Sequence, residues 1–555
     1  MQHQRTETPA GGPFGLRLRH LQLALGLACL FMLAACNTET LEPQSLESQT
    51  PEPNSGAHLS PTAVVTNVAW NERVELAVSG NFPVTVKYGT TVLPVVQRSN
   101  DRVVFDLPAA PALSTLSIAP SVDISTFNTA PSGTELNSYA NRGTVDVLVT
   151  RSSNGVLVSS QSYQPFGSVE SGELTVIGPP TNGQCPSLLT GFSNVEGPFS
   201  YEVNGQAVCL RTVGFTARGT AAARSTYASA RPTQSVDRNV VSSLDPTGKG
   251  AVDPNCGQIE KWLNPITSGN FGNLNMGNYQ TVTNASNRGG TDGSTIRVHI
   301  AGSGIGVNDH ISCNPEANFE DHDTHIRDLI QTLAPNVSIL EKKVCDDNGN
   351  CPASSVAKGL LEIGQAASSA PNTRNDIINL SLGAPIPGTA VYQAIKLMES
   401  DVLVVASGGN HPFAADHFPA SHANGLGKVP VPLLNVIAVA GAGLENSSAT
   451  WQIAGYNTRK NANLFAPGAG LCPPSALGFR CNATSLLPYG TVGIAGSSFA
   501  APGVTGIAAL YLQRSGRTLN PSSLKTCLET KSNSSTVLNG GNAYNGMVWY
   551  DPTGC

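Results

Sequence analysis

The sequence predicts an α/β fold with a parallel sheet covered by helices on both faces, preceded by small β-sandwich modules. From about residue 290, short apolar strands alternate with segments whose apolar residues keep helical spacing, as in residues 326–333. Between about residues 61 and 160, apolar residues alternate over short runs that turn residues separate. The first pattern is typical of a parallel sheet and the second of β-sandwiches. At 555 residues, the chain is too long for a single core, so both are expected in it.

The N-terminus carries an export signal. Basic residues precede an apolar run over residues 21–35, which is too short to span a membrane comfortably. The run ends in Leu-Ala-Ala-Cys, which resembles the lipobox of bacterial lipoproteins, where the cysteine takes a diacylglycerol. An ordinary secretory signal that contains a cysteine is the alternative. We expect an exported protein, anchored through lipid on Cys36 in the membrane of the cell envelope or at the cell surface.

The remaining cysteines agree with export. The net charge gives no support for a nucleic acid as partner. Ten cysteines remain besides Cys29 and Cys36, and an even number in an exported chain predicts disulfides. Pairing of neighbours in chain order is the simplest expectation. No CxxC pair occurs, so we expect no structural zinc site. The net charge of −6 gives no reason to expect a nucleic acid as partner.

The most specific motif is the run G-S-S-F-A-A-P-G-V-T-G at residues 496–506. It is similar to the motif G-T-S-M-A-A-P-H-V-A-G of subtilisin-like serine proteases (subtilases), with seven of eleven positions identical. The resemblance implies that Ser498 is the nucleophile. At the start of a helix, free amides and the helix dipole favour a developing oxyanion. Pro502 is expected in the first turn, where amides lack partners. A plain capping serine before a buried helix is the alternative.

Two further segments resemble the substrate cleft of the same family. Residues 401–410 form an apolar strand that ends in Gly-Gly-Asn, like the oxyanion segment of subtilases, which implies that Asn410 points its amide at the substrate oxyanion. A simple strand-to-turn ending is the alternative. The run N-L-S-L-G resembles the strand beside the cleft. There the backbone of Ser381, Leu382 and Gly383 would pair with an extended peptide.

The run D-H-D-T-H-I at residues 321–326 resembles the H-G-T-H-V-A-G segment of subtilases. The resemblance implies that His322 is the general base and His325 a structural histidine. One departure is that the glycine after the base is Asp323. Asp321 and Asp323 are also explained as helix N-caps. A metal site formed by both histidines and these carboxylates is a further alternative, although the open zinc patterns are not matched.

The family's aspartate is missing. Subtilases carry V-I-D-T-G or V-I-D-S-G at the end of the first strand, whereas this chain reads I-A-G-S-G, with Gly302 in the aspartate position. Asp292 and Asp309 are too far away along the chain, and neighbours of His322 on a helix should diverge from it. We therefore expect no carboxylate to reach His322, and expect Gly302→Asp to raise kcat.

The resemblance implies a serine endopeptidase that cleaves protein or peptide substrates by acyl transfer, weakened because Gly302 replaces the aspartate. The alternative is a catalytically impaired pseudoprotease that binds peptides at the surface. No cofactor is expected; substrate preference, calcium sites and oligomeric state are not readable from the sequence. The expected segments are a signal peptide (1–36), a flexible tether (37–60), a β module that resembles immunoglobulin-like TIG domains (61–120), a second β module (121–180), a propeptide-like or linker region (181–255) and the subtilase peptidase domain (256–555).

Overall fold

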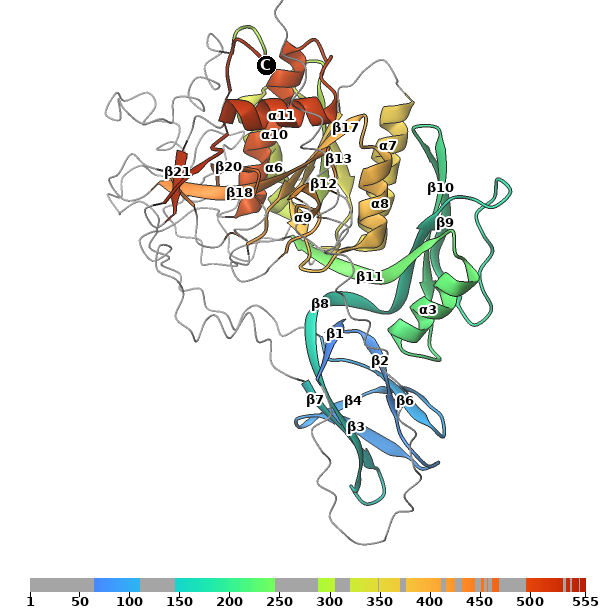
Figure 1. Ribbon diagram of the computed structural model, residues 1–555. Helices are drawn as coiled ribbons and strands as arrows, with labels where there is room; N and C mark the ends of the chain where they lie inside the picture. The colour runs from blue at the N-terminus through green and yellow to red at the C-terminus, as the bar shows by residue number, and fades with distance from the viewer. Residues whose placement is uncertain are drawn as a thin grey trace, which may run out of the picture. The chain divides into compact units, whose positions relative to one another are not determined.

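The structure is a computed structural model, drawn in Figure 1. It describes residues 64–109, 145–244, 288–304, 320–347, 349–369, 376–410, 416–424, 432–444, 451–453, 457, 462–468, 496–532, 536–539, 542–548 and 550–555. The predicted lipid site at Cys36, the signal peptide and the tether lie outside these residues, as does Asp309.

A largely parallel sheet forms the centre of the C-terminal half. Its strands run in the order β13-β12-β15-β17-β18-β19-β21-β22, and β20 pairs with β18. The pairs from β13 to β18 are parallel, as is the pair of β18 with β20. The strands are β12 (Arg297–Gly302), β13 (Ser338–Lys343), β15 (Asp376–Leu380), β17 (Val402–Ser407), β18 (Val436–Leu444), β19 (Trp451–Ile453), β20 (Leu464–Pro467), β21 (Thr536–Asn539) and β22 (Asn542–Asn545).

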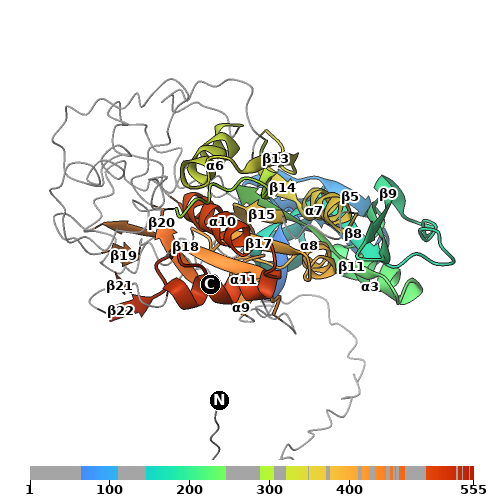
Figure 2. The same cartoon turned by 90° about the horizontal axis from the view of Figure 1, so that it is seen from above.

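Helices cover both faces of this sheet, as Figure 2 shows from above. One face packs against α6 (Glu320–Leu333), α10 (Ser497–Arg514) and α11 (Pro521–Ser532), and buries Val298, Ile377 and Val405. The other face packs against α7 (Ala353–Ser368) and α8 (Thr389–Leu397), and buries Ile378 and Val404. Neighbouring residues of a strand point to opposite faces, so fully apolar strands such as β17 are those of a sheet buried on both sides. The predicted fold class is confirmed.

The N-terminal strands form two packed antiparallel layers. One layer holds β2 (Arg73–Ala77), β5 (Val95–Arg98) and β6 (Arg102–Asp106); the other holds β3 (Val84–Tyr88), β4 (Thr91–Leu93) and β7 (Val145–Arg151). Val74 and Phe105 from the first layer share a core with Val86 and Val147 from the second. Such packing of two apolar faces makes a β-sandwich.

One long strand connects these layers to the next region. β8 (Leu157–Gly178) pairs through its first half with β7 and with β1 (Val65–Trp70). Its second half pairs with β10 (Gln206–Gly214) and β11 (Ser235–Leu244), and β9 (Ser193–Val203) pairs with β10. Helix α3 (Thr220–Ala230) covers this sheet. The segment predicted to be propeptide-like is therefore a β-sheet with one helix over residues 193–244.

The region of β9 to β11 is docked against α7 and α8. Asn239 in β11 accepts a hydrogen bond through Oδ1 from the backbone amide of Ser354 in the first turn of α7, at 3.1 Å. Thr389, the first residue of α8, donates its hydroxyl to Asp237 at 2.6 Å. Tyr201 and Val203 are buried in the same core as α7 and α8. One of the free amides at the start of α7 is thus satisfied by a partner more than a hundred residues earlier.

Three disulfides join neighbours in chain order, as predicted. They are Cys185–Cys209, Cys345–Cys351 and Cys527–Cys555. The other predicted partners, Cys256, Cys313, Cys472 and Cys481, lie outside the described residues.

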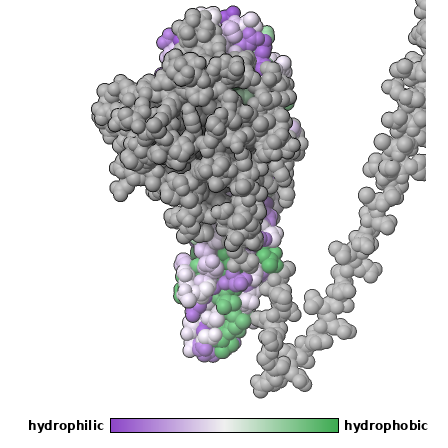
Figure 3. Space-filling view, turned by 90° about the vertical axis from the view of Figure 1, so that its left-hand side faces the viewer, coloured by the Kyte–Doolittle hydropathy of each residue, from purple (hydrophilic) through white to green (hydrophobic). Residues whose placement is uncertain are grey.

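Figure 3 shows hydrophobic surface over the described N-terminal strands. The large apolar side chains exposed in this part of the chain include Val92, Leu148, Val156 and Leu157. Within the described ranges, no helix has the length and apolar character to cross a membrane.

Candidate active site

Ser498 lies in the first turn of α10, buried to 0 % exposure. The helix follows Gly496, whose φ of 151° is a backbone conformation that favours glycine. Alanines and glycines make the helix thin, and nearly all of it is buried, so Ser498 is held rigidly at the carboxyl edge of the sheet. The early amides of α10 have no partners within the helix and can donate to a developing oxyanion beside Ser498.

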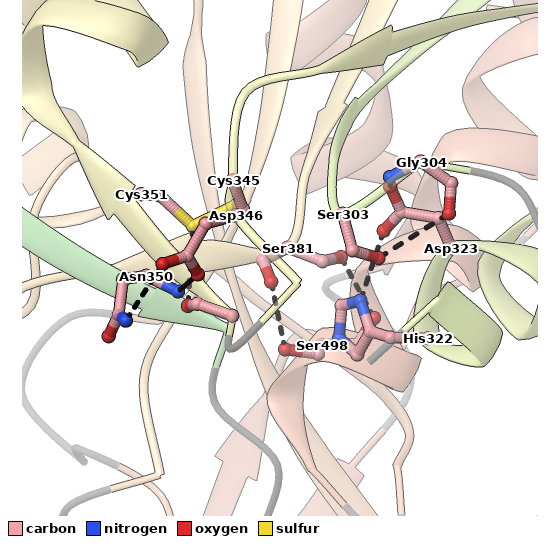
Figure 4. The surroundings of a disulfide bond; sticks show 11 residues. Ser303, Gly304, His322, Asp323, Cys345, Asp346, Asn350, Cys351, Ser381 and Ser498 are labelled. Carbon is pink, nitrogen blue, oxygen red and sulfur yellow. Dashed lines mark hydrogen bonds and ion pairs between the residues drawn. A yellow bond between two sulfur atoms is a disulfide. The ribbon is translucent and has the colours of Figure 1, made fainter. Parts of the chain in front are cut away.

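Pro502 connects the nucleophile to the predicted substrate strand. It is the sixth residue of α10 rather than part of the first turn, so that prediction is wrong. Because proline has no amide hydrogen, the carbonyl of Ser498 lacks its usual partner four residues later. The Ser381 hydroxyl lies 2.9 Å from this carbonyl and 2.8 Å from Asn379 Oδ1, so these two acceptors share its single proton, and the Ser381 carbonyl accepts a hydrogen bond from Ser498 Oγ at 3.1 Å. Two hydrogen bonds therefore fix Ser381 beside the nucleophile, as Figure 4 shows.

Asn410 follows β17 and approaches the start of α10. Its Oδ1 accepts hydrogen bonds from the backbone amide of Ser497 at 2.8 Å and from the Ser497 hydroxyl at 2.9 Å. An amide hydrogen needs an acceptor, so the oxygen end of the Asn410 side chain is fixed at Ser497 and Nδ2 is its donating end. The Gly409 amide also donates to Ser497 Oγ, at 3.0 Å, with Gly409 at a φ of +89°. The predicted oxyanion residue and nucleophile helix are thus directly connected.

His322 lies in the first turn of α6 and packs against α10. Its ring contacts the ring of Phe499, the residue after Ser498, with centroids 5.5 Å apart. The side chain is buried, and its Nε2 has no hydrogen-bond partner among the residues that the structure describes. Nε2 is the nitrogen that a general base would present to a serine hydroxyl.

A carboxylate holds the other ring nitrogen. Asp323 Oδ1 lies 3.0 Å from His322 Nδ1, and Asp323 Oδ2 accepts a hydrogen bond from the backbone amide of Gly304 at 2.8 Å. Asp323 is 1 % exposed. A buried carboxylate with one oxygen on an amide and the other on an imidazole is fixed in orientation, and it keeps the imidazole proton on Nδ1.

Gly302 makes room for this carboxylate. A Cβ atom at Gly302 would lie 2.5 Å from Asp323 Oδ2 and 2.8 Å from its Cγ, far inside van der Waals contact. Any side chain at the end of β12 would therefore displace Asp323. The carboxylate of Asp323 occupies the space that a side chain from position 302 would enter.

One expectation about this site is therefore wrong, and a second loses its physical basis. A carboxylate does reach His322, although the two residues are neighbours on α6. Side chains at successive helix positions leave the axis in different directions, but the Asp323 carboxylate lies beside Ser303 and Gly304, and the His322 ring lies between it and Ser498 (Figure 4). Gly302→Asp is also not expected to raise kcat, because its side chain would meet Asp323. The alternative of a metal site involves His325 and Asp321, whose side chains lie outside those that the structure describes, so it stays a prediction; among the described side chains, no three His, Cys, Asp or Glu form a metal-binding group.

A second histidine–carboxylate pair lies elsewhere in the sheet. His299 Nε2 is 2.7 Å from Asp376 Oδ1, and Arg297 donates to the same carboxylate. Burial opposes ionisation of Asp376, but the hydrogen bonds from His299 and Arg297 outweigh burial, so the pKa of Asp376 is lowered. Asp376 begins β15, whereas Ser498 lies beyond the strand ends, so this pair stabilises the sheet and is not part of the site.

The substrate strand is paired with another part of the chain. β16 (Leu382–Gly383) and β14 (Asn350–Pro352) both pair with β11, antiparallel, so β11 lies between them. In the register, Ser243 is opposite Gly383 and Leu244 is opposite Leu382. The Leu244 amide also donates to the Gly349 carbonyl at 3.0 Å. Backbone groups of Leu382 and Gly383 do pair with an extended segment, which here is the protein's own β11.

Known proteins are similar to the C-terminal half of the chain. Over 287 residues, 48 % of this chain, the sequence is 29 % identical to an alkaline protease of Alkalihalobacillus alcalophilus and to subtilisin Savinase of Lederbergia lenta. The chain spans 65 % of the first relative and 92 % of the second, and 57 % of the M-protease of Shouchella clausii, to which it is 28 % identical. Among solved structures, fervidolysin from Fervidobacterium pennivorans is 18 % identical, with a TM-score of 0.48, over 70 % of this chain and 62 % of its own.

The family model of the subtilases, Peptidase_S8, matches residues 269–547, which is half of the chain. This range contains the nucleophile helix, the histidine helix and the substrate strands described above. The chain belongs to the subtilase family of subtilisin-like serine proteases.

Proposed function

We propose that this protein is an active serine endopeptidase whose catalytic residues are Ser498, His322 and Asp323, with Asn410 in the oxyanion hole. The observation that carries the proposal is the buried Asp323 carboxylate, 3.0 Å from His322 Nδ1. It removes the reason to expect a weak enzyme, because a carboxylate at Nδ1 is what the missing family aspartate would have supplied. The alternative of an impaired peptide-binding protein rested on that missing carboxylate.

The proposed mechanism requires the Ser498 hydroxyl, which donates to the Ser381 carbonyl in the structure, to turn toward His322 Nε2. Ser498 Oγ attacks the peptide carbonyl while His322 Nε2 takes its proton, and Asp323 stabilises the imidazolium through Nδ1. The oxyanion accepts hydrogen bonds from Asn410 Nδ2 and an amide at the start of α10. His322 then gives its proton to the leaving amine as the acyl-enzyme forms. Water, deprotonated by His322, hydrolyses the acyl-enzyme and restores Ser498.

The region over residues 193–244 is proposed to act as a pro-segment that occupies the cleft before maturation. β11 supports this because it pairs with both β14 and β16, as an extended substrate would. Asn239 and Asp237 accept hydrogen bonds from the starts of α7 and α8, which adds affinity outside the cleft. We expect peptide hydrolysis to rise when this region is removed by cleavage.

We also propose that the protein is an exported lipoprotein, attached to the membrane through Cys36. The support is the Leu-Ala-Ala-Cys sequence that closes the apolar run of residues 21–35. Cys36→Ala should move the protein out of the membrane fraction. If Cys36→Ala remains there to the same extent, lipid on this residue is not the anchor.

Activity is tested with the full chain and two probes. Hydrolysis of an unfolded protein is followed together with labelling by a fluorophosphonate, which reacts only with an activated serine. We expect both signals in the wild type and neither in Ser498→Ala, with Ser515→Ala, a serine at the other end of α10, as the matched control. A wild type that binds peptides but shows neither signal would establish the binding-protein alternative.

A further inference from the structure

The register of β11 identifies the position of the substrate residue that precedes the scissile bond. β11 runs antiparallel to β16, with Ser243 opposite Gly383 and Leu244 opposite Leu382. A peptide bound in this register and extended by one residue would place that residue opposite Ser381. The Ser381 carbonyl accepts a hydrogen bond from Ser498 Oγ at 3.1 Å, so this residue would present its carbonyl to the nucleophile. It is the P1 residue of the substrate.

The register also fixes the face on which the P1 side chain lies. Directly opposite residues of an antiparallel pair point to the same face, and residues two apart on one strand do so too. The P1 side chain therefore shares a face with the side chains of positions 381 and 383. A Cβ atom at Gly383 would lie within 3 Å of three atoms of the His417 ring. Because Gly383 has no side chain, the His417 ring approaches that face of the strand directly.

A buried hydroxyl lies on the same face. In the parallel pair of β15 and β17, Leu380 is opposite Ala406, so the next residues, Ser381 and Ser407, are level with each other. Ser407 is 0 % exposed, and its Oγ has no hydrogen-bond partner among the described residues. A buried hydroxyl without a partner is costly, so a ligand group that accepts its hydrogen bond recovers that cost.

We propose that His417 and Ser407 form the polar end of the P1 pocket and select substrates with aspartate or glutamate at P1. This rests on the proposed protease function and adds its substrate class. Both side chains can donate a hydrogen bond, and a carboxylate is the acceptor that gains most from two donors in a buried site. Both are buried to about 1 % exposure or less, so water does not screen the interaction. The residue that follows Leu244 in the sequence is Asp245, which carries the proposed chemistry.

The test compares peptides that share Ser-Ser-Leu at P4 to P2, the sequence of residues 242–244. Their P1 residue is aspartate, glutamate, asparagine, glutamine, leucine or lysine, and each reports kcat/KM with the full chain. A pro-segment in the cleft lowers every rate by the same factor and leaves their ratios unchanged. We expect aspartate or glutamate to exceed its amide by about 10- to 100-fold, the effect of one or two hydrogen bonds to a charged group.

Variants assign the preference to these side chains. His417→Phe keeps a ring but removes its donors, so the acid-to-amide ratio should fall close to one while the leucine peptide is cleaved at least as well. Ser407→Ala removes one oxygen and should lower the ratio about tenfold. His422→Phe is the matched control, because that histidine packs between Tyr392 and Phe418.

Two results would overturn the inference. If the wild type cleaves after leucine in preference to an acidic residue, the His417 ring merely fills the pocket. If His417→Phe and Ser407→Ala keep the wild-type ratio, other residues determine it. Fluorophosphonate labelling separates these outcomes from failure of the proposed function. If the wild type is labelled but shows no acid preference, only this inference fails; if it stays unlabelled after cleavage has removed residues 193–244, both fail.

Discussion

The starts of α10 and α6 both carry residues of the candidate active site, but they differ in how closely their sequences follow the subtilase motifs. At α10 the sequence keeps most of the family motif, and Ser498 lies in the first turn of the helix, where the Ser497 amide donates to Asn410 Oδ1. Around α6 the pattern is altered at two places: Gly302, at the end of β12, stands where the family has an aspartate, and Asp323 stands where the family has a glycine. The carboxylate still lies at His322 Nδ1. The comparison shows that a carboxylate can reach the same ring nitrogen from another position in the chain, so the lost aspartate at position 302 and the added Asp323 are two parts of one change.

The largest effect is expected from removing the negative charge of Asp323 in α6. Asp323→Asn keeps the size of the side chain but removes the charge that stabilises the imidazolium, and its amide can hold the wrong tautomer of His322. We expect kcat to fall about 10⁴-fold with a much smaller change in KM. Steady-state kinetics across pH measures this. Asp328→Asn, on the same helix, is the control for loss of a negative charge.

An unchanged kcat in Asp323→Asn would mean that Asp323 only holds the Gly304 amide and the start of α6. In that case the fall would appear in thermal stability instead.

The second largest effect is expected from removing the Asn410 side chain, which contacts the start of α10. Asn410→Ala removes a donor to the oxyanion and should lower kcat by about 10²- to 10³-fold. Because the oxyanion forms only in the transition state, KM should change little. Steady-state kinetics with one peptide substrate separates the two parameters. A rise in KM at constant kcat would show that Asn410 acts in ground-state binding.

A smaller effect tests whether Ser381 compensates for the amide hydrogen that Pro502 lacks. Ser381→Ala leaves the Ser498 carbonyl without a hydrogen bond inside a buried helix, since Pro502 cannot supply one. We expect kcat/KM to fall about tenfold and stability to fall by about 1–2 kcal/mol. Pro502→Ala in the Ser381→Ala background restores an amide donor and should recover part of the stability. No recovery would show that the carbonyl does not need this partner.

His422 provides the contrast to His322, because its ring has no hydrogen-bond partner among the described residues. Burial lowers the pKa of His422 to about 4. In the unfolded chain its pKa is about 6.5, so protons bind the unfolded state first as pH falls. The stability that the neutral ring provides is therefore complete above about pH 6.5 and is lost as pH falls toward 4, by roughly 3 kcal/mol.

His422→Phe should remove this loss while keeping the ring contacts with Tyr392 and Phe418. Urea unfolding at pH 7 and pH 4.5 measures it. Equal acid sensitivity in the wild type and His422→Phe would contradict the assignment.

Much of the peptidase domain is predictable from its sequence, because its strands and helices are local patterns. Ser498, His322 and Asn410 are found through short motifs. The contact of Asp323 with His322 is not predicted, because the divergence of neighbouring helix residues describes the direction in which side chains leave the helix and not where their ends lie. The signal that could have found it is the pairing of two departures, a missing carboxylate at 302 and an added one at 323.

The docking of β11 could not be predicted from local pattern. Its partners in β14 and β16 lie more than a hundred residues further along the chain, and alternation within residues 235–244 is compatible with many partners. Nothing in β11 alone indicates a substrate-like role. The His417 and Ser407 positions likewise depend on the register of β11, β16 and β17, which the sequence does not specify.

The most direct measurement of the relocated carboxylate is kcat for the wild type, Gly302→Asp, Asp323→Gly and the double variant Gly302→Asp/Asp323→Gly. Gly302→Asp places a second side chain against Asp323 and should lower activity, while Asp323→Gly removes the carboxylate and should lower it about 10⁴-fold. The double variant returns the carboxylate to the end of β12 and should recover most of the lost activity. A Gly302→Asp enzyme that is faster than the wild type, with Asp323 still present, would contradict the proposal that Asp323 replaces the aspartate missing at position 302.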